Sequence, residues 1–118
     1  MKKLFVEVMS SEEALKRFSR AWKSAAAGKS QDATIAVGSI AELTALLSPK
    51  RMELLRHVAQ NPGLSIRALA GELRRDYKNV HTDVCELEAR HLLERDESGS
   101  VKAPFDELHI RAPLRAAA

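Results

Sequence analysis

The sequence predicts an α+β fold, in which an N-terminal β-α-β-α segment precedes three helices and a β-hairpin. Residues 65–92 hold two successive apolar patterns typical of amphipathic helices. The first has apolar side chains at i, i+3, i+4 and i+7, and the second continues with the same helical period; the members are Ile66, Leu69, Ala70 and Leu73, then Tyr77, Val80, Val84 and Leu87. Only Arg74 and Arg75 separate the two patterns, so a sharp turn joins the helices. A further helix starts at Pro49, and a hairpin follows with Gly99 at a left-handed position. Three helices followed by a hairpin is the order of a winged helix-turn-helix.

The N-terminal segment consists of two short strands, each followed by a helix. The predicted strands are residues 4–9 and 34–37, which are rich in apolar and β-forming side chains. Ser10 and Glu13 form a capping box before the first helix. Ser39 and Glu42 repeat this pattern before the second. Because a helix connects the two strands, they are expected to be parallel if they are adjacent.

The first helix carries an apolar stripe, and we expect this stripe to be core rather than the lining of a ligand pocket. Its members are Leu15, Phe18, Trp22 and Ala25. On the opposite face, Glu12 and Lys16 form a favourable i,i+4 pair, as do Glu13 and Arg17. Gly28 is expected to end the helix, and residues 29–32 to form a loop.

Residues 105–111 alternate between apolar and polar side chains and are expected to form a strand. This strand either joins the two N-terminal strands or pairs across a dimer. The predicted division of the chain is residues 1–47 as an N-terminal extension for dimerisation or partner binding, 48–112 as the winged helix-turn-helix core, and 113–118 as a flexible tail.

Composition indicates a soluble globular protein of one-domain size. The 118 residues are 45% hydrophobic and 30% charged, with a net charge of +3, which permits nucleic-acid binding without requiring it. A single cysteine suits the reducing cytoplasm. Glu7 interrupts the opening before a signal-peptide core forms, and no apolar run is long enough to span a bilayer. We therefore expect a cytoplasmic protein without membrane contact.

The helix over residues 77–90 carries polar side chains away from its apolar stripe, near its N-terminal end. These candidate DNA contacts are Lys78, Asn79, His81 and Thr82. An asparagine can bind adenine through two hydrogen bonds, and a lysine can reach guanine or phosphate. Asn79 and Lys78 are therefore the predicted base-reading residues.

Other polar residues are better suited to phosphates, which position a protein on DNA without reading its sequence. The predicted phosphate contacts are Ser65, Arg67, Arg74, Arg75 and, on the strands of the hairpin, Arg95 and Lys102. Ser65 stands at a helix N-terminus, where free backbone N–H groups favour anions. The hairpin tip carries Asp96 and Glu97, which the negative minor groove would repel. The hairpin is therefore expected to support binding and not to lead it.

Other chemistry is poorly represented. His81 and Cys85 are one helical turn apart, but two ligands make half a metal site and no second cluster accompanies them. The sequence holds no recognisable nucleophile–base pair, glycine-rich phosphate loop or carboxylate dyad. We expect no metal, no cofactor and no enzymatic activity.

Residues 48–108 resemble the winged helix-turn-helix of MarR-type and related prokaryotic regulators, most closely a subgroup of small regulators with an Arg-Asp-Tyr-Lys-Asn-Val-His motif, here residues 75–81. The resemblance implies DNA binding, and members of the subgroup are sometimes antitoxin-like partners. The chain departs from the pattern at Arg90 and His91, where such proteins usually carry Leu-Gly. Because His is enriched among non-glycine residues at positive φ, we predict a positive φ at His91.

These observations predict a sequence-specific DNA-binding transcriptional regulator, a homodimeric repressor that inserts the helix of residues 77–90 into the major groove of double-stranded DNA. The alternative is an antitoxin or protein-interaction module, which binds and inhibits a partner toxin and also represses its own operon.

Overall fold

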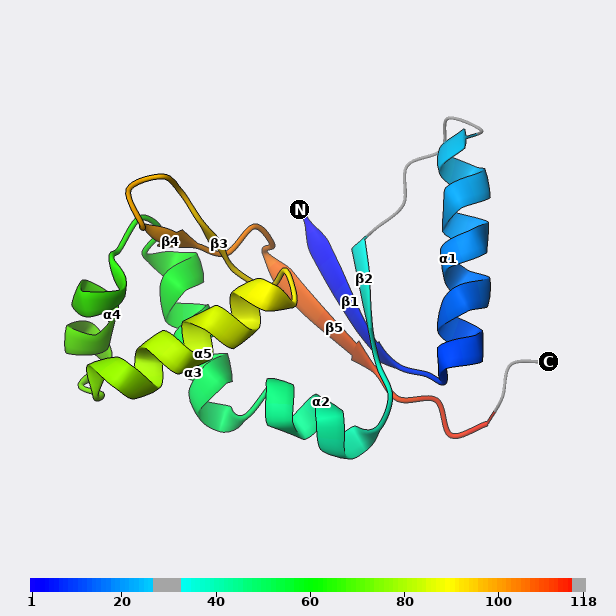
Figure 1. Cartoon of the computed structure of the whole chain (residues 1–118), viewed down its shortest axis with the longest axis horizontal. Helices are drawn as coiled ribbons and strands as arrows, with labels where there is room; N and C mark the ends of the chain where they lie inside the picture. The colour runs from blue at the N-terminus through cyan, green and yellow to red at the C-terminus, as the bar shows by residue number, and fades with distance from the viewer. Residues whose placement is uncertain (27–32, 116–118) are drawn as a thin grey trace. The chain divides into compact units, whose positions relative to one another are not determined.

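The computed structural model describes residues 1–26 and 33–115, and the chain is a mixed α+β protein (Figure 1). It divides into two units, one made of Met1–Ala45 with Glu107–Ala118 and the other of Leu46–Asp106. The predictions for Gly28, residues 29–32 and the last three residues of the tail lie outside the described residues. No helix in the described ranges is long and apolar enough to cross a membrane.

The first unit contains a three-stranded parallel sheet with the order β2-β1-β5. Its strands are β1 (Lys3–Val8), β2 (Ala33–Val37) and β5 (Glu107–Arg111). The parallel pairing of the first two strands is confirmed. Of the two alternatives for the last strand, the structure shows the first, because β5 lies beside β1. Residues 107–111 therefore belong with the N-terminal unit and not with the segment 48–112 to which the sequence assigned them.

Helix α1 (Ser11–Ala26) begins as predicted, since the Ser10 hydroxyl oxygen accepts the Glu13 backbone N–H at 3.2 Å. The pair between Glu12 and Lys16 also forms, at 3.6 Å. The pair predicted between Glu13 and Arg17 is replaced, because Arg17 instead donates to Glu7 Oε1 at 3.0 Å.

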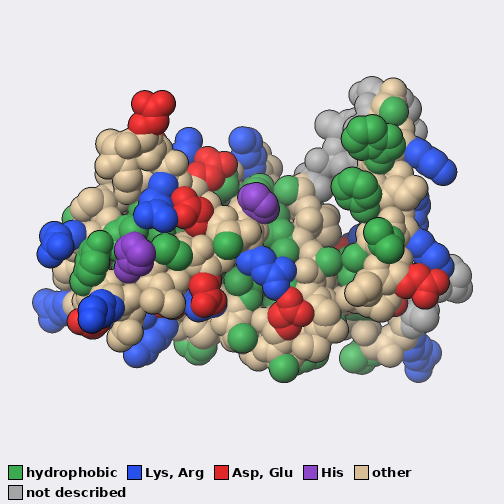
Figure 2. All heavy atoms as spheres, in the orientation of Figure 1, with side chains coloured by type: hydrophobic (Ala, Val, Ile, Leu, Met, Phe, Trp, Pro, Cys, Tyr) green, Lys and Arg blue, Asp and Glu red, His purple; other side chains and the backbone are tan. Residues whose placement is uncertain are grey.

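The prediction that the apolar stripe of α1 is core was wrong for its three large members, Leu15, Phe18 and Trp22, while the side chain of Ala25 lies outside the described residues. Phe18 is 68% exposed and Trp22 69% exposed, and Figure 2 shows hydrophobic side chains along one face of this helix. The physical reason is that α1 is attached to the sheet through another face, where Arg17 reaches the buried carboxylate of Glu7. The helix is amphipathic as predicted, but its apolar face does not pack on the sheet of the same chain.

The second unit packs helices α3 (Pro49–Gln60), α4 (Ile66–Leu73) and α5 (Tyr77–Ala89) with the antiparallel strands β3 (Glu94–Arg95) and β4 (Val101–Lys102). The short helix α2 (Ile40–Leu46) leads into it. Its core consists of side chains with at most 2% exposure, among them Leu54, Val58, Leu69, Val80, Val84, Leu87, Leu93 and Val101. Every one comes from an apolar position, so burial of these stripes is what stabilises the helix cluster.

Helix α5 ends at Ala89, and His91 has φ 64°, so the predicted positive φ is confirmed. The His91 backbone N–H donates to Glu88 O at 3.0 Å, and the next N–H, of Leu92, donates to Leu87 O at 2.9 Å. These two hydrogen bonds satisfy carbonyls at the helix end, and their geometry requires the left-handed conformation of His91.

His91→Gly should raise the free energy of unfolding by about 0.5–1 kcal/mol, because glycine adopts this conformation without a Cβ penalty. Urea unfolding measures the change. Ala89→Gly, two residues earlier in ordinary helix, is the matched control and should instead destabilise by about 1 kcal/mol. A loss of stability in both variants would show that the conformation at His91 carries no strain.

Candidate nucleic-acid interface

The turn between α4 and α5 is closed by Arg74, which adopts φ 55° in the left-handed region. Its backbone N–H donates to Gly71 O at 3.2 Å, and the N–H of Arg75 donates to Ala70 O at 3.0 Å. At the other end of α4, the Ser65 hydroxyl oxygen accepts the Ala68 N–H at 3.1 Å. These caps bound a short helix at both ends and turn the chain sharply into α5.

Helix α5 divides into a buried side and an exposed side. Val80 and Val84 are fully buried, whereas Lys78, Asn79 and Thr82 are exposed. The Thr82 hydroxyl donates to Lys78 O at 3.0 Å, so its methyl and oxygen are held in one orientation. The three predicted DNA contacts therefore share one solvent-facing surface in the first turns of α5. We call Lys78, Asn79 and Thr82 the exposed face of α5.

Tyr77 extends this surface towards α4. Tyr77 begins the predicted apolar pattern of this helix, but its side chain is 40% exposed. The Arg67 guanidinium lies over its ring, 4.9 Å from the centroid, and the ring of His81 is 5.8 Å away. Arg67 is thus held beside the exposed face of α5 by a cation–π contact, while His81 is half-buried.

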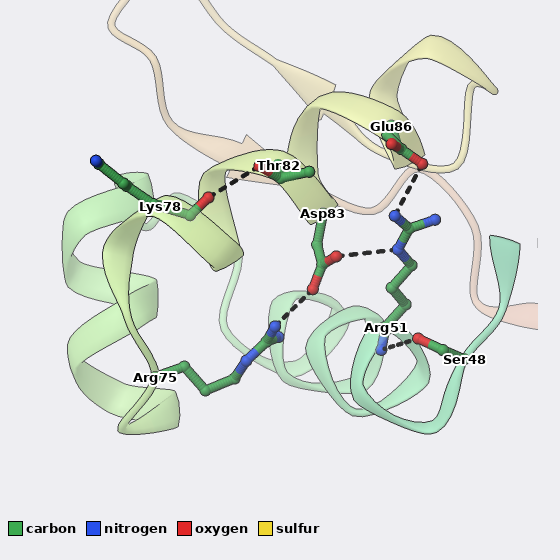
Figure 3. Close-up of polar contacts among 7 residues, drawn as sticks. All are labelled: Ser48, Arg51, Arg75, Lys78, Thr82, Asp83 and Glu86. Carbon is green, nitrogen blue, oxygen red and sulfur yellow. Dashed lines mark hydrogen bonds and ion pairs between the residues drawn. The ribbon is translucent and has the colours of Figure 1, made fainter. Parts of the chain in front are cut away.

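Arg75 is placed away from this surface. It donates to Asp83 Oδ2 at 2.7 Å, and its side chain is 15% exposed. Asp83 Oδ1 in turn accepts from Arg51 Nε at 3.0 Å, and Arg51 Nη2 donates to Glu86 at 2.8 Å. Figure 3 shows Asp83 pointing between the two arginines, while Lys78 extends away from them. We call Arg51, Arg75, Asp83 and Glu86 the arginine–carboxylate cluster.

This cluster joins the start of α3, the α4–α5 turn and the middle of α5. Burial opposes the charged form of Arg51, but hydrogen bonds to Asp83 and Glu86 outweigh it and raise the pKa of Arg51. The sequence reasoning missed this role for Arg75. The one local signal was that Asp83 and Glu86 stand at i and i+3 on one helix, and the sequence reasoning did not use it. Arg51, which binds both carboxylates, is 32 residues away in sequence from Asp83.

The hairpin forms as predicted, with Gly99 at φ 86°. Asp96 closes its tip, because its Oδ1 accepts the backbone N–H groups of Ser98 at 2.9 Å and Ser100 at 3.0 Å. Hydrogen bonds from the Ser98 hydroxyl and these N–H groups lower the pKa of Asp96. Lys102, the predicted phosphate contact of the hairpin, lies 3.6 Å from Glu94, and both side chains are more than half exposed.

Arg95 ties the hairpin to α5 by donating to Glu88 from Nη2 at 2.7 Å and from Nε at 3.1 Å. The hydrogen bond from Arg95 lowers the pKa of Glu88 against the opposing effect of burial. A carboxyl whose pKa is lower in the folded state stabilises the fold above its unfolded pKa, and this contribution is lost as the pH falls.

Glu88→Gln should therefore flatten the loss of stability between roughly pH 5 and pH 3, with an effect below about 1 kcal/mol since the pair is partly solvated. Urea unfolding at several pH values measures it. Glu53→Gln removes the same charge from an exposed position on α3 and should leave that acid limb unchanged. Identical acid limbs for wild type and Glu88→Gln would contradict the assignment.

His81 and Cys85 approach each other, with 3.6 Å between Sγ and Nδ1. Arg95 also contacts the sulfur, at 3.7 Å. Within the part of the chain that the structure describes, no group of three or more metal-binding side chains is present. The contact remains half of a metal site.

The surface and the cluster lie within the part of the chain that a known family covers. Residues 46–110 match the family model HVO_A0114, and the chain belongs to the HVO_A0114 family. No curated protein and no solved structure matches the chain. The family name states no activity, so a function has to be argued from the side chains.

Proposed function

We propose that the second unit is a winged helix-turn-helix and that the protein is a cytoplasmic, sequence-specific DNA-binding transcriptional regulator, as the resemblance to MarR-type regulators implies. The observation that supports this most directly is the exposed face of α5. Lys78, Asn79 and Thr82 project together from the first turns of a helix whose other side is core. The first turns of a recognition helix are where base contacts are made.

The order and pairing of the elements support the same proposal. α4 and α5 follow each other through a sharp turn, and the β3–β4 hairpin comes next. Leu64, just before α4, bridges antiparallel to Val101 of β4, so the hairpin is attached to the start of the helix pair. A hairpin attached to the start of the helix pair supports its assignment as a wing.

The residues divide into three roles under this proposal. Lys78 and Asn79 read bases, assisted by Thr82 and His81. The phosphate contacts are Ser65, Arg67, Arg74 and Lys102, which are all exposed. Arg75 belongs to the arginine–carboxylate cluster and orients α5 without touching DNA.

The regulator is proposed to act as a homodimeric repressor, with two α5 helices in major grooves about one DNA turn apart. The test is a gel shift on DNA upstream of its own gene against random competitor DNA at two salt concentrations, followed by footprinting. A salt-sensitive shift and a two-fold symmetric footprint are expected. No shift at low salt would reject DNA binding.

An antitoxin role is the second candidate, because the exposed apolar side chains of α1 would suit a protein partner. A toxin-like reading frame beside the gene, and its product bound to the untagged protein at a fixed ratio, would favour it.

A further inference from the structure

The apolar face of α1 is a continuous stripe of large exposed side chains. Leu15, Phe18 and Trp22 are exposed by 69%, 68% and 69%, and they stand at i, i+3 and i+7 of one helix. Figure 2 shows hydrophobic side chains gathered along this helix. Single exposed hydrophobic residues are ordinary, whereas a stripe of three, two of them aromatic, marks a contact surface. We call these three residues the α1 stripe.

The α1 stripe is left open by the way in which α1 is attached. Among the residues of α1 whose burial is described, Ala14 and Ala21 are half-buried, and Arg17 on the same side reaches Glu7 of β1 at 3.0 Å. At about 100° per residue, this attached side is roughly a quarter turn from the stripe. A polar anchor between Arg17 and the 4% exposed Glu7 therefore holds the helix with its large apolar residues turned elsewhere.

The charges beside the stripe indicate what covers it. Glu12 and Lys23 lie on the same flank of the stripe, at about 100° per residue, but at opposite ends of α1. Lys16 shares this flank and lies 3.6 Å from Glu12 in the same chain, so the end of α1 near Glu12 is charge-balanced and the end near Lys23 is positive. In an antiparallel pair of identical helices, Glu12 of each copy meets the Lys23 end of the other. The helix dipoles also oppose each other favourably in this arrangement. In a parallel pair related by a two-fold axis, this flank of the two copies would lie on opposite sides of the contact, so Glu12 and Lys23 would not meet.

The area fits a modest dimer. Side chains of these types with about two thirds of their surface exposed present roughly 400 Å² per copy, hence roughly 800 Å² for two copies. The apolar share of a homodimer interface is about 65%, so such a core corresponds to an interface of roughly 1,200 Å². This is the lower end of the range for stable interfaces.

We propose that the α1 stripe is the contact surface for a second copy of this chain, paired antiparallel about a two-fold axis near the middle of α1. The interface is isologous, since the same stripe and the same flank serve both copies. The inference rests on the proposed function only in that it names the surface through which the regulator would form its homodimer. The observations that support it all come from α1 and its attachment to the sheet.

Trp22 is the single tryptophan of the chain, so its emission reports on this surface only. The full-length protein should be studied by sedimentation equilibrium and tryptophan fluorescence from about 0.1 to 100 μM, a range around a micromolar dissociation constant. The dimer fraction should rise with concentration, and the Trp22 emission should shift to the blue in parallel. A monomer at all concentrations, or a dimer in which Trp22 still emits in the red, would overturn the proposal.

Leu15→Glu should weaken the dimer by about 100-fold or more, because each copy would bury an unpaired carboxylate. The matched control is Leu114→Glu, the same change at a residue that is 99% exposed and outside α1, and it should leave the dimer intact. Far-ultraviolet circular dichroism of both variants confirms that they are folded. An equal loss of dimer in both, or in neither, would contradict the role of the stripe.

Charge exchange tests the antiparallel arrangement. Glu12→Lys and Lys23→Glu should each weaken the dimer several-fold, and the double variant should recover it, because each reversed charge then meets its opposite. Additive losses in the double variant would reject the antiparallel second copy. DNA binding is measured separately. A dimer with blue-shifted Trp22 emission that gives no gel shift would reject the proposed function but not this inference. A gel shift by a protein whose Trp22 stays exposed would reject this inference but not the proposed function.

Discussion

Asp83→Ala is expected to lower the free energy of unfolding by about 3 kcal/mol. Asp83 accepts hydrogen bonds from Arg51 and Arg75, whose side chains are 12% and 15% exposed. Removing the carboxylate leaves the guanidiniums of Arg51 and Arg75 largely buried and without the negative charge that they share. Arg75 Nη1 is already buried without a hydrogen-bond partner, so losing the bond to Asp83 adds a second unsatisfied group on this side chain. Urea or thermal unfolding of the full chain measures the loss.

The control is Glu86→Ala in the same cluster. Glu86 accepts from Arg51 at 2.8 Å but is 58% exposed, so its removal should cost less than about 1 kcal/mol. Losses of equal size in the two variants would show that the cluster acts through surface charge and not through buried pairing. Because α5 carries the proposed base contacts, Asp83→Ala should also reduce DNA affinity at temperatures near its unfolding transition.

Lys78→Ala and Asn79→Ala should each weaken specific DNA binding by about 1–3 kcal/mol, which is roughly 5- to 150-fold, while binding to random DNA changes much less for Asn79. Both side chains are exposed, so their truncation leaves the stability of the fold unchanged within about 0.5 kcal/mol. Gel-shift titration on the operator and on random DNA, with urea unfolding alongside, separates the two effects.

Arg67→Ala and Arg74→Ala are the comparison variants for phosphate contacts. Each should weaken specific and random DNA similarly and reduce the slope of log affinity against log salt by about one unit. Arg75→Ala should resemble Asp83→Ala instead, with a loss of stability. If Asn79→Ala and Arg67→Ala lost affinity equally on both DNAs, the division between reading and positioning residues would be wrong.

The elements whose signals are local could be predicted from the sequence. Ser48 and Ser65 cap their helices through contacts only three residues along the chain. The turn at Gly99 and the positive φ at His91 follow from the backbone needs of a hairpin tip and a helix end. The pattern of apolar residues in α5 likewise indicated Val80, Val84 and Leu87 as core. In each case the interactions that determine the structure join residues close together in sequence, so the local sequence is enough to predict them.

Three features depended on tertiary structure, because the partners are distant in sequence. The pairing of β5 with β1 brings residues about 100 positions apart into register, and the alternation of β5 could not choose between partners. From the sequence Arg75 was interpreted as a phosphate contact, but in the fold it binds Asp83, which also binds Arg51. The apolar stripe of α1 was visible in the sequence, but whether such a face meets its own sheet depends on which side of the helix is attached to the sheet. Here the buried Glu7 binds Arg17, and this polar contact leaves Leu15, Phe18 and Trp22 facing outwards.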